Sequence, residues 1–243
     1  MSEISQQNIE FYLSTKNPCP YLENKNERKL FTHLSGHKAL VQMQLLSEHG
    51  FRRSQNIIYR PNCKNCSECK STRVKIDAFE LSKSQKRIIN KNKDIKAIIC
   101  ETKVSDEHYE LFQKYLNERH KDGNMAAMSF DEFNDMMTDT PVNSAIVEYH
   151  LKDGKKDVLV AVVLLDILLD GASMVYSFFD PRFDKKSLGV FMILDNILRL
   201  KEKKQKHLYL GYWVKGSKTM AYKINYKPIE FYSEGKGWQK LNK

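Results

Sequence analysis

Apolar residues recur every three or four positions along five segments of the chain, and this spacing predicts five helices. In the first segment, Leu40, Met43 and Leu46 form the apolar stripe. Asp106 is expected to cap the start of the third helix, because its side chain can accept a backbone N–H. The predicted helices span residues 36–49, 82–93, 106–120, 130–137 and 187–204.

Runs of β-branched, aromatic and leucine residues predict four strands at residues 144–151, 158–169, 174–179 and 208–212. Turn-forming residues at 152–155 and 170–171 separate the first three strands, so we expect an antiparallel meander. A long helix then leads to the fourth strand. We therefore predict an α+β fold with a mainly antiparallel sheet flanked by helices, in the order typical of GNAT-type acyltransferases.

The residue pattern changes between residues 77 and 96, from a segment rich in turn signals and cysteines to segments with helical spacing, which predicts a domain boundary there. The part before it is rich in turn signals and holds four of the five cysteines. We expect a small cysteine-bearing N-terminal domain of residues 1–80 and a GNAT-like domain of residues 81–243.

Composition supports a folded protein and argues against a membrane span. The 243 residues are 41% hydrophobic with only 6 Pro and 10 Gly, which excludes collagen-like and low-complexity chains. The longest apolar run, residues 158–165, is far shorter than the roughly 18 residues that cross a bilayer. Residues 1–10 lack the features of a secretory signal, so we expect a cytoplasmic protein.

The net charge of +10 points towards a polyanionic partner, although solubility alone also explains it. Residues 1–75 carry +6, residues 76–137 carry −2 and residues 138–243 carry +6. Five of the nine arginines lie in the first 75 residues, where planar guanidinium groups could bind carboxylate or phosphate.

Four cysteines of the N-terminal part form a candidate metal site. Cys63, Cys66 and Cys69 make a C-x2-C-x2-C array, and Cys19 lies upstream. Their thiolates could hold Zn²⁺ or an iron–sulfur cluster. The alternative is that some of them are small buried apolar residues.

A strand, a polar loop and a helix start follow one another over residues 176–189, which is anion-binding geometry. We expect Lys185, Lys186, Ser187, Leu188 and Gly189 to contact phosphate, unless this is an ordinary turn. Coenzyme A is usually held by a loop with several glycines, whereas this loop has Gly189 alone, which counts against coenzyme A as the donor. The 3′ end of an aminoacyl-tRNA remains a possible donor.

Aromatic residues and lysines alternate over residues 210–228, a pattern that suits a single-stranded nucleic-acid end. Trp213 and Lys223 are candidate contacts to the donor, together with Phe178 upstream. The alternative is a set of core aromatics with solvated lysines.

Several motifs in register resemble the arginyl-tRNA–protein transferase family. They are residues 19–22 (CPYL), 50–54 (GFRRS), 59–61 (YRP) with the cysteine array, 176–181 (YSFFDP), 187–189 (SLG) and 211–213 (GYW). The short length and the cysteine array are similar to the bacterial branch, the aspartate/glutamate leucyltransferases. The chain departs from the family at Gln55, where relatives often have Gly, which puts that turn in doubt.

The resemblance implies transfer of leucine from leucyl-tRNA to the N-terminal α-amino group of proteins beginning with Asp or Glu, which feeds N-end rule degradation. It also implies a GNAT-like C-terminal half and, in some relatives, an iron–sulfur cluster. Exchanging an ester for an amide is downhill, so we expect positioning of the two substrates to suffice and no cofactor to be required for the chemistry.

Site residues follow from that reaction. Asp180 is expected to orient the amine or a proton-relay water, with capping of the next turn as the alternative. Hydroxyl groups that could stabilise the oxyanion belong to Tyr176, Ser177 and Tyr212. The acceptor carboxylate is expected to pair with Arg52, Arg53 and Arg60, whose alternative role is contact with tRNA phosphate.

Three alternatives stay open at this point. No residue decides between leucine and arginine as the transferred group. An acetyl-CoA-dependent N-acetyltransferase shares the predicted order of elements, and a zinc-stabilised RNA-binding protein without catalysis would explain the charge and the cysteines.

Overall fold

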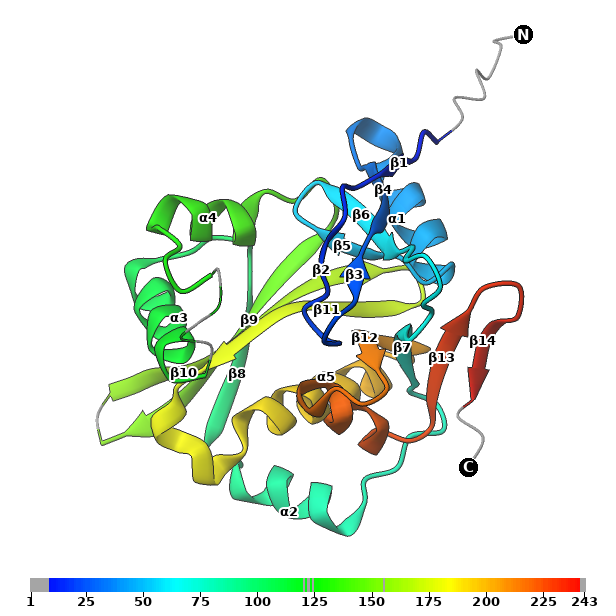
Figure 1. The fold of residues 1–243 in the computed structure, drawn as a ribbon. Coiled ribbons are helices and arrows are strands. Elements are labelled where there is room, and N and C mark those ends of the chain that lie inside the picture. Colours follow the sequence, from blue (N-terminus) through cyan, green and yellow to red (C-terminus); the bar gives the residue numbers. More distant parts are fainter. Residues whose placement is uncertain (1–8, 120, 122, 124, 155, 241–243) are drawn as a thin grey trace, which may run out of the picture.

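The structure is a computed structural model, and it describes residues 9–119, 121, 123, 125–154 and 156–240 (Figure 1). The N-terminal segment that was examined for a secretory signal lies largely outside the described residues, as do the end of the third predicted helix at residue 120 and part of the turn at 152–155. Among the described residues, no helix is long and apolar enough to cross a membrane.

All five predicted helices are present, joined by short 3-10 helices. The helices are α1 (Ala39–Glu48), α2 (Lys83–Lys91), α3 (Asp106–Arg119), α4 (Phe130–Thr138) and α5 (Leu188–Glu202), and the 3-10 helices are η1 (Gly36–Lys38), η2 (Pro181–Lys186) and η3 (Lys218–Asn225).

The four predicted strands are also present, and ten further strands join them. The strands are β1 (Tyr12–Leu13), β2 (Asn17–Pro18), β3 (Asn26–Glu27), β4 (Lys29–His33), β5 (Arg52–Ser54), β6 (Ile57–Pro61), β7 (Cys69–Lys75), β8 (Ile95–Cys100), β9 (Ser144–Asp153), β10 (Lys156–Leu168), β11 (Gly171–Phe179), β12 (His207–Val214), β13 (Ile229–Ser233) and β14 (Gly237–Lys240).

Eight strands form one large sheet in the order β14-β13-β7-β12-β11-β10-β9-β8. The predicted antiparallel meander is confirmed by β9, β10 and β11. Strand β12 returns parallel to β11 after the α5 crossover, and it is the one parallel pair among the described strands. The α+β class with a mainly antiparallel sheet and flanking helices is therefore confirmed.

Helices cover both faces of this sheet, which gives it two apolar interfaces (Figure 1). On one face, α5 packs its buried Ile193, Leu194 and Ile197 against β7, β11 and β12, and α2 adds Ile88. On the other face, α3 and α4 enclose a cluster around Phe112. The β10 strand reads as one continuous apolar run because both of its faces are buried.

A second sheet, in the order β1-β4-β6-β5, packs with α1 against the end of β10. Its core includes Met43 and Leu46 from α1 and Leu168 from β10. Leu40, which the helical spacing placed with them, is 46% exposed, so that part of the predicted stripe was wrong.

The boundary predicted near residue 80 does not separate the two sheets. Strand β7 precedes it in the chain, yet β7 lies between β12 and β13 of the large sheet. The pattern of residues could not reveal this, because the partners of β7 follow it by more than 130 positions.

Helix starts follow the sequence closely. Ser82 and Gln85 form a capping box at α2, and Ser129 and Glu132 form another at α4. Asp106 is the first residue of α3 rather than its cap, where its charge still favours the helix N-terminus.

Candidate functional site

The parallel strands β11 and β12 separate soon after they begin. Their pairing is confined to residues 171–173 and 207–209, although β11 continues to Phe179 and β12 to Val214. We call the diverging parts, residues 174–179 and 210–214, the strand fork. Val175 forms a bulge here, since Tyr176 and Met174 face consecutive residues of β10. A bulge frees backbone polar groups and re-aims side chains, which is common beside active sites.

The N-terminus of α5 lies next to the strand fork. Ser187 adopts a left-handed conformation with φ of +54°, and α5 starts at Leu188. Within the described residues, the N–H groups of Leu188 and Gly189 have no backbone acceptor, as expected for the first turn of a helix. A side chain at Gly189 would press on Phe179, whose Cε1 lies 3.2 Å from the position of such a Cβ. This end of α5 can therefore receive an anion from the side of η2.

The two lysines of the preceding loop differ in availability. Lys185 is exposed, whereas the Nζ of Lys186 donates to both carboxylate oxygens of Asp94 at 2.8 Å. Lys186 thus anchors the loop to the end of α2, and Lys185 is the lysine that faces solvent.

Three tyrosines from three elements gather at the strand fork. Tyr115 of α3 lies close enough to Tyr176 of β11 and to Tyr222 of η3 to contribute to the raised pKa of both. Burial is the main cause of the raised pKa in each case, so both hydroxyl groups stay protonated at neutral pH. The Tyr176 hydroxyl contacts only the Met125 sulfur, at 3.8 Å, among the described hydrogen bonds. Because a thioether sulfur is a weak acceptor, the Tyr176 hydroxyl can turn its proton towards a substrate oxygen.

Asp180 is held by its own neighbour. Its carboxylate caps η2 by accepting the Arg182 N–H at 2.9 Å, and the Arg182 guanidinium donates to both of its oxygens. Burial alone would raise the pKa of Asp180, but the hydrogen bonds from Arg182 outweigh it and lower the pKa. The geometry matches the capping alternative, and a carboxylate so engaged is a weak base.

Tyr212 and Trp213 of β12 are engaged in contacts within the protein. The Tyr212 hydroxyl is buried and donates to the carbonyls of Gly50 and Tyr59, at 3.2 and 2.9 Å, so its proton is committed. Trp213 packs edge-on against Phe231, with ring centroids 5.2 Å apart. The prediction that Tyr212 donates to the substrate ester is corrected here, because it joins β12 to the N-terminal sheet instead.

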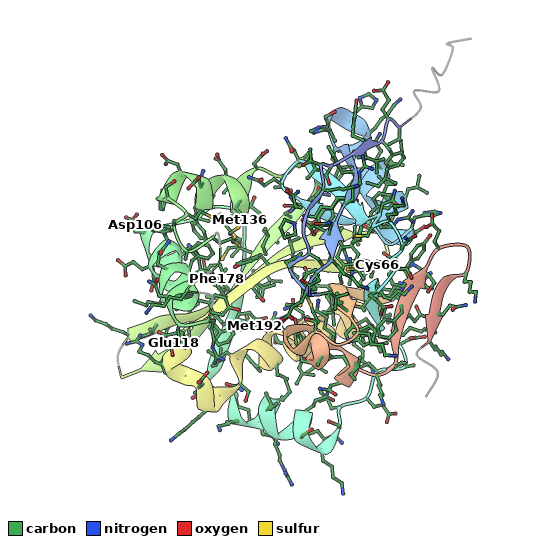
Figure 2. The ribbon with its side chains drawn as sticks, viewed as in Figure 1. Cys66, Asp106, Glu118, Met136, Phe178 and Met192 are labelled. Atoms are coloured by element: carbon green, nitrogen blue, oxygen red, sulfur yellow. The ribbon has the colours of Figure 1, made fainter. Side chains whose placement is uncertain are left out.

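Phe178 and Leu188 are core residues. Phe178 is fully buried between β11 and the helices α3 and α4 (Figure 2). Leu188, the first residue of α5, is 1% exposed and packs into the core on the other face of the sheet. The prediction that the Phe178 side chain contacts the donor is therefore corrected. For Leu188 only the side chain is buried, and its backbone N–H at the start of α5 stays a candidate for phosphate contact. Ser177, on the opposite face of β11 from Phe178, is half-buried and stays a candidate.

Two of the three arginines expected to bind the acceptor are buried and occupied. Arg53 forms a two-pronged ion pair with Asp166, at 2.7 and 2.6 Å, and the Arg53 side chain is 1% exposed. Arg52 donates to the Thr72 carbonyl at 2.7 Å and stacks on the Tyr209 ring. The prediction that these two guanidinium groups meet an acceptor carboxylate is therefore corrected: they join the two sheets.

Arg60 differs from Arg52 and Arg53 in exposure. It pairs with Glu234, whose side chain is 81% exposed, and lines a surface cavity with Cys66 and Lys70. Nearby, Gln55 has a φ of +50°, the left-handed conformation that favours glycine. Relatives often have Gly at position 55. The turn at Gln55 nevertheless has the backbone conformation that a glycine would adopt.

Lys223 is a buried cation without a carboxylate among its described partners. It is 5% exposed, and its Nζ donates to the carbonyl of Tyr212. Burial, and secondarily the nearby charge of Arg52, lower the pKa of Lys223 to about 7. Lys223 therefore supports the turn between β12 and η3 and is not placed to meet phosphate in solvent.

This environment predicts that stability rises with pH. Between pH 7 and about 10 the unfolded chain holds a proton on Lys223 that the folded chain has released, so unfolding takes up a proton. We expect the wild type to gain on the order of 2 kcal/mol more than Lys223→Met between pH 7 and pH 9, measured by urea unfolding. The variant retains the tyrosines and Cys69, so their titration cancels. Equal gains in both proteins would contradict a buried, largely neutral Lys223.

The four predicted cysteines share one cavity. Cys19, Cys63, Cys66 and Cys69 line it, and the ring of Tyr212 closes one side. Burial, followed by the neighbouring cysteines, raises the pKa of Cys69 to about 12. In the part of the chain that the structure describes, no three His, Cys, Asp or Glu side chains are arranged to hold a metal ion. A Zn²⁺ ion or an iron–sulfur cluster at this cavity stays a prediction.

Residue patterns missed two members of the site, Tyr115 and Tyr222. Tyr115 looked like part of the apolar stripe of α3, and Tyr222 looked like one aromatic in an alternating run. A signal was present in Tyr115, because a tyrosine in an amphipathic stripe brings a hydroxyl that must find a partner.

Comparisons with known proteins cover most of the chain. The family models described as arginine-tRNA-protein transferase, N terminus and C terminus, match residues 17–87 and 107–233. A relative from Agrobacterium fabrum, named aspartate/glutamate leucyltransferase, is 44% identical over 237 residues, covering 95% of this chain and 94% of its own. A relative from Brucella ovis with the same name is 43% identical and covers 99% of both chains.

Among solved structures, a C-terminal DUF2156 domain from Agrobacterium fabrum matches with a TM-score of 0.43 and 14% identity. The match covers 72% of this chain and 52% of that one.

Proposed function

Because the chain belongs to the arginine-tRNA-protein transferase family, we propose that it transfers leucine from leucyl-tRNA to the N-terminal α-amino group of proteins beginning with Asp or Glu. One observation supports leucine rather than arginine as the transferred amino acid. The chain is 44% identical to a relative named aspartate/glutamate leucyltransferase, over nearly the whole of both chains. The product would begin with leucine and enter N-end rule degradation. Since leucyl-tRNA is the donor, we place the reaction in the cytoplasm.

The donor fits the strand fork. Its terminal phosphates would meet the N–H groups of Leu188 and Gly189, with Lys185 adding charge. The leucyl ester would then lie beside the Val175 bulge and the Tyr176 hydroxyl.

The chemistry asks little of the protein beyond positioning. The acceptor amine attacks the ester carbonyl, and the bond from the carbonyl carbon to the 3′ oxygen of the tRNA breaks. The amine loses one proton, and a water molecule passes a proton to the 3′ oxygen, which leaves as a hydroxyl group. An α-amino group has a pKa of about 7.7 to 8.0, so a usable neutral fraction exists at pH 7. The Tyr176 hydroxyl would donate to the developing oxyanion, and water would accept the proton, because Asp180 is engaged by Arg182.

The acceptor would approach from the side of the N-terminal sheet. Arg60 is the most exposed of the three predicted arginines, with a side chain that is 19% exposed. Its partner Glu234 is 81% exposed and would be displaced by a substrate carboxylate. The cavity it lines is bordered by the cysteines. No cofactor is proposed for the chemistry. A cluster at the cysteines would instead have a structural role in the cavity that Arg60 lines.

The proposal is tested with radiolabelled leucyl-tRNA and arginyl-tRNA, offered to one model protein whose first residue is Asp, Glu, Lys or Ala. We expect leucine on the Asp and Glu proteins alone, and no transfer to an Asp protein whose α-amino group is acetylated. The acetylated protein is the matched control, since it differs only at the nucleophile.

Other results would redirect the assignment. Transfer of arginine would contradict leucine specificity. Absence of transfer from either donor, with tRNA still bound, would favour an RNA-binding protein, and acetylation by acetyl-CoA would favour an N-acetyltransferase.

A further inference from the structure

Helix α2 presents to solvent a face whose charged side chains are all basic. Lys83, Lys86, Arg87 and Lys91 are exposed, and residues 83–91 contain no Asp or Glu. None of these four side chains takes part in the ion pairs of the described residues. The opposite side of the helix, with Ile88 and Ile89, packs against the sheet and α5. The basic face is thus held rigidly outward rather than neutralised within the protein.

This face adjoins the donor side of the strand fork. Asn92, just after α2, donates through Nδ2 to the carbonyl of Lys186 at 2.9 Å, and Lys186 reaches back to the carbonyl of Lys91. The C-terminal end of α2 is therefore fixed beside the start of α5, where the donor phosphates are proposed to lie. At 1.5 Å per residue, its nine residues carry the charges roughly 13 Å away from that point.

The basic surface continues beyond the other end of α2. A surface groove there is lined by Lys75, Lys201, Lys204 and Lys206, and by one acidic residue, Asp77, which pairs with Lys75. Lys201 donates to the carbonyl of Phe79 at 2.7 Å, which holds the segment before α2 against the end of α5. Positive charge therefore extends from Lys185 along α2 to this groove.

The net charge of successive sequence segments does not reveal this basic surface. Residues 76–137 sum to −2, because the acidic residues of α3 and α4 offset the basic residues of α2. In the fold these groups lie on opposite faces of the sheet, so the α2 side is strongly positive (Figure 1).

We propose that the basic face of α2 binds the phosphate backbone of the acceptor stem of the donor tRNA. This inference rests on the proposed function and extends it from the reacting end to the duplex. The unpaired 3′ end of a tRNA is short, so the stem must pass close to the strand fork once the ester is in place. Unpaired lysine and arginine side chains along a rigid helix suit regularly spaced phosphates and carry no base readout.

An acidic acceptor protein is the other polyanion that could contact α2. The position of the helix favours RNA, because α2 borders the start of α5, whereas Arg60 and the cysteine cavity lie by the N-terminal sheet. The test below separates the two partners.

The test compares Lys86→Ala/Arg87→Ala with Lys236→Ala/Lys240→Ala, which removes two exposed lysines beside β13 and β14. We expect the α2 pair to weaken the Kd for leucyl-tRNA about tenfold and to lower the slope of log Kd against log salt by about 1 for each lost phosphate contact. The control pair should bind as the wild type does. A second α2 variant, Lys83→Ala/Lys91→Ala, should repeat the effect even if the first folds poorly.

A minimal donor separates this inference from the proposed function. Leucine esterified to a short CCA oligonucleotide lacks the stem, so the α2 pair should transfer it at the wild-type rate. Wild-type Kd and salt slope in both α2 variants would overturn the inference, as would a raised KM for the acceptor protein with an unchanged Kd for tRNA. Failure of the wild type with both donors would instead refute the proposed function, while the tRNA Kd would still report on α2.

Discussion

Replacing Asp166 with Ala is expected to lower the free energy of unfolding by about 3–5 kcal/mol, because it leaves the Arg53 guanidinium buried without its counter-ion. Asp166 accepts two hydrogen bonds from Arg53 and one from Ser144 at 2.7 Å, and its own side chain is fully buried. The pair joins β5 of the N-terminal sheet to β10 of the large sheet. Urea unfolding followed by circular dichroism measures the loss.

Two controls separate the buried charge from general damage. Arg60→Ala removes an arginine whose partner Glu234 is mostly exposed, so its cost should stay within about 1 kcal/mol. The double variant Arg53→Met/Asp166→Leu removes both charges and should recover much of the loss. A double variant as unstable as Asp166→Ala would show that the unpaired charge is not the cause.

The same ion pair shows that residue patterns do not predict contacts between side chains that are far apart in the sequence. Arg53 and Asp166 are 113 positions apart, and no periodicity links them. In the sequence Arg53 looked like a surface residue suited to a carboxylate, and the expectation of a carboxylate partner was sound in its chemistry. The fold supplies that partner internally, which makes the arginine a structural link instead of a substrate contact.

Local signals predicted the elements well because their causes are local. The capping serines Ser82 and Ser129 mark helix starts, and the Asp170-Gly171 turn joins two strands that follow one another in the chain. Strand β7 escaped notice because Val74 is the one aliphatic residue among its seven, and the strand carries three basic residues. One of them, Arg73, pairs with Glu230 on β13. A short strand with a charged residue becomes recognisable only beside the strand that pairs with it.

The site was predicted in part for the same reason. The start of α5 and the cysteine array are contiguous in sequence, and the fold brings Cys19 to the other three. The aromatic residues could not be sorted into core and site by type alone, because Phe178 and Tyr176 are two positions apart on one strand. Both are on the α3 side, and Tyr176 differs by its hydroxyl, which donates to the Met125 sulfur.

That hydroxyl leads to the largest expected effect on activity. Tyr176→Phe should lower kcat for leucyl transfer by about 100-fold, the usual consequence of losing one oxyanion donor, while leaving KM for leucyl-tRNA unchanged. The ring keeps its contacts with Phe112 and Phe178, so the fold should be preserved. Single-turnover transfer with saturating leucyl-tRNA measures the chemical step directly.

Tyr209→Phe is the matched control, because it removes a buried tyrosine hydroxyl on β12 that donates to Asp170 and lies away from the strand fork. Its kcat should stay near the wild-type value even if its stability falls. A Tyr176→Phe enzyme with wild-type kcat would transfer the oxyanion role to the Ser177 hydroxyl or to a backbone N–H at the Val175 bulge, since both belong to the β11 part of the strand fork. A raised KM with unchanged kcat would instead place the hydroxyl in contact with the bound donor before reaction.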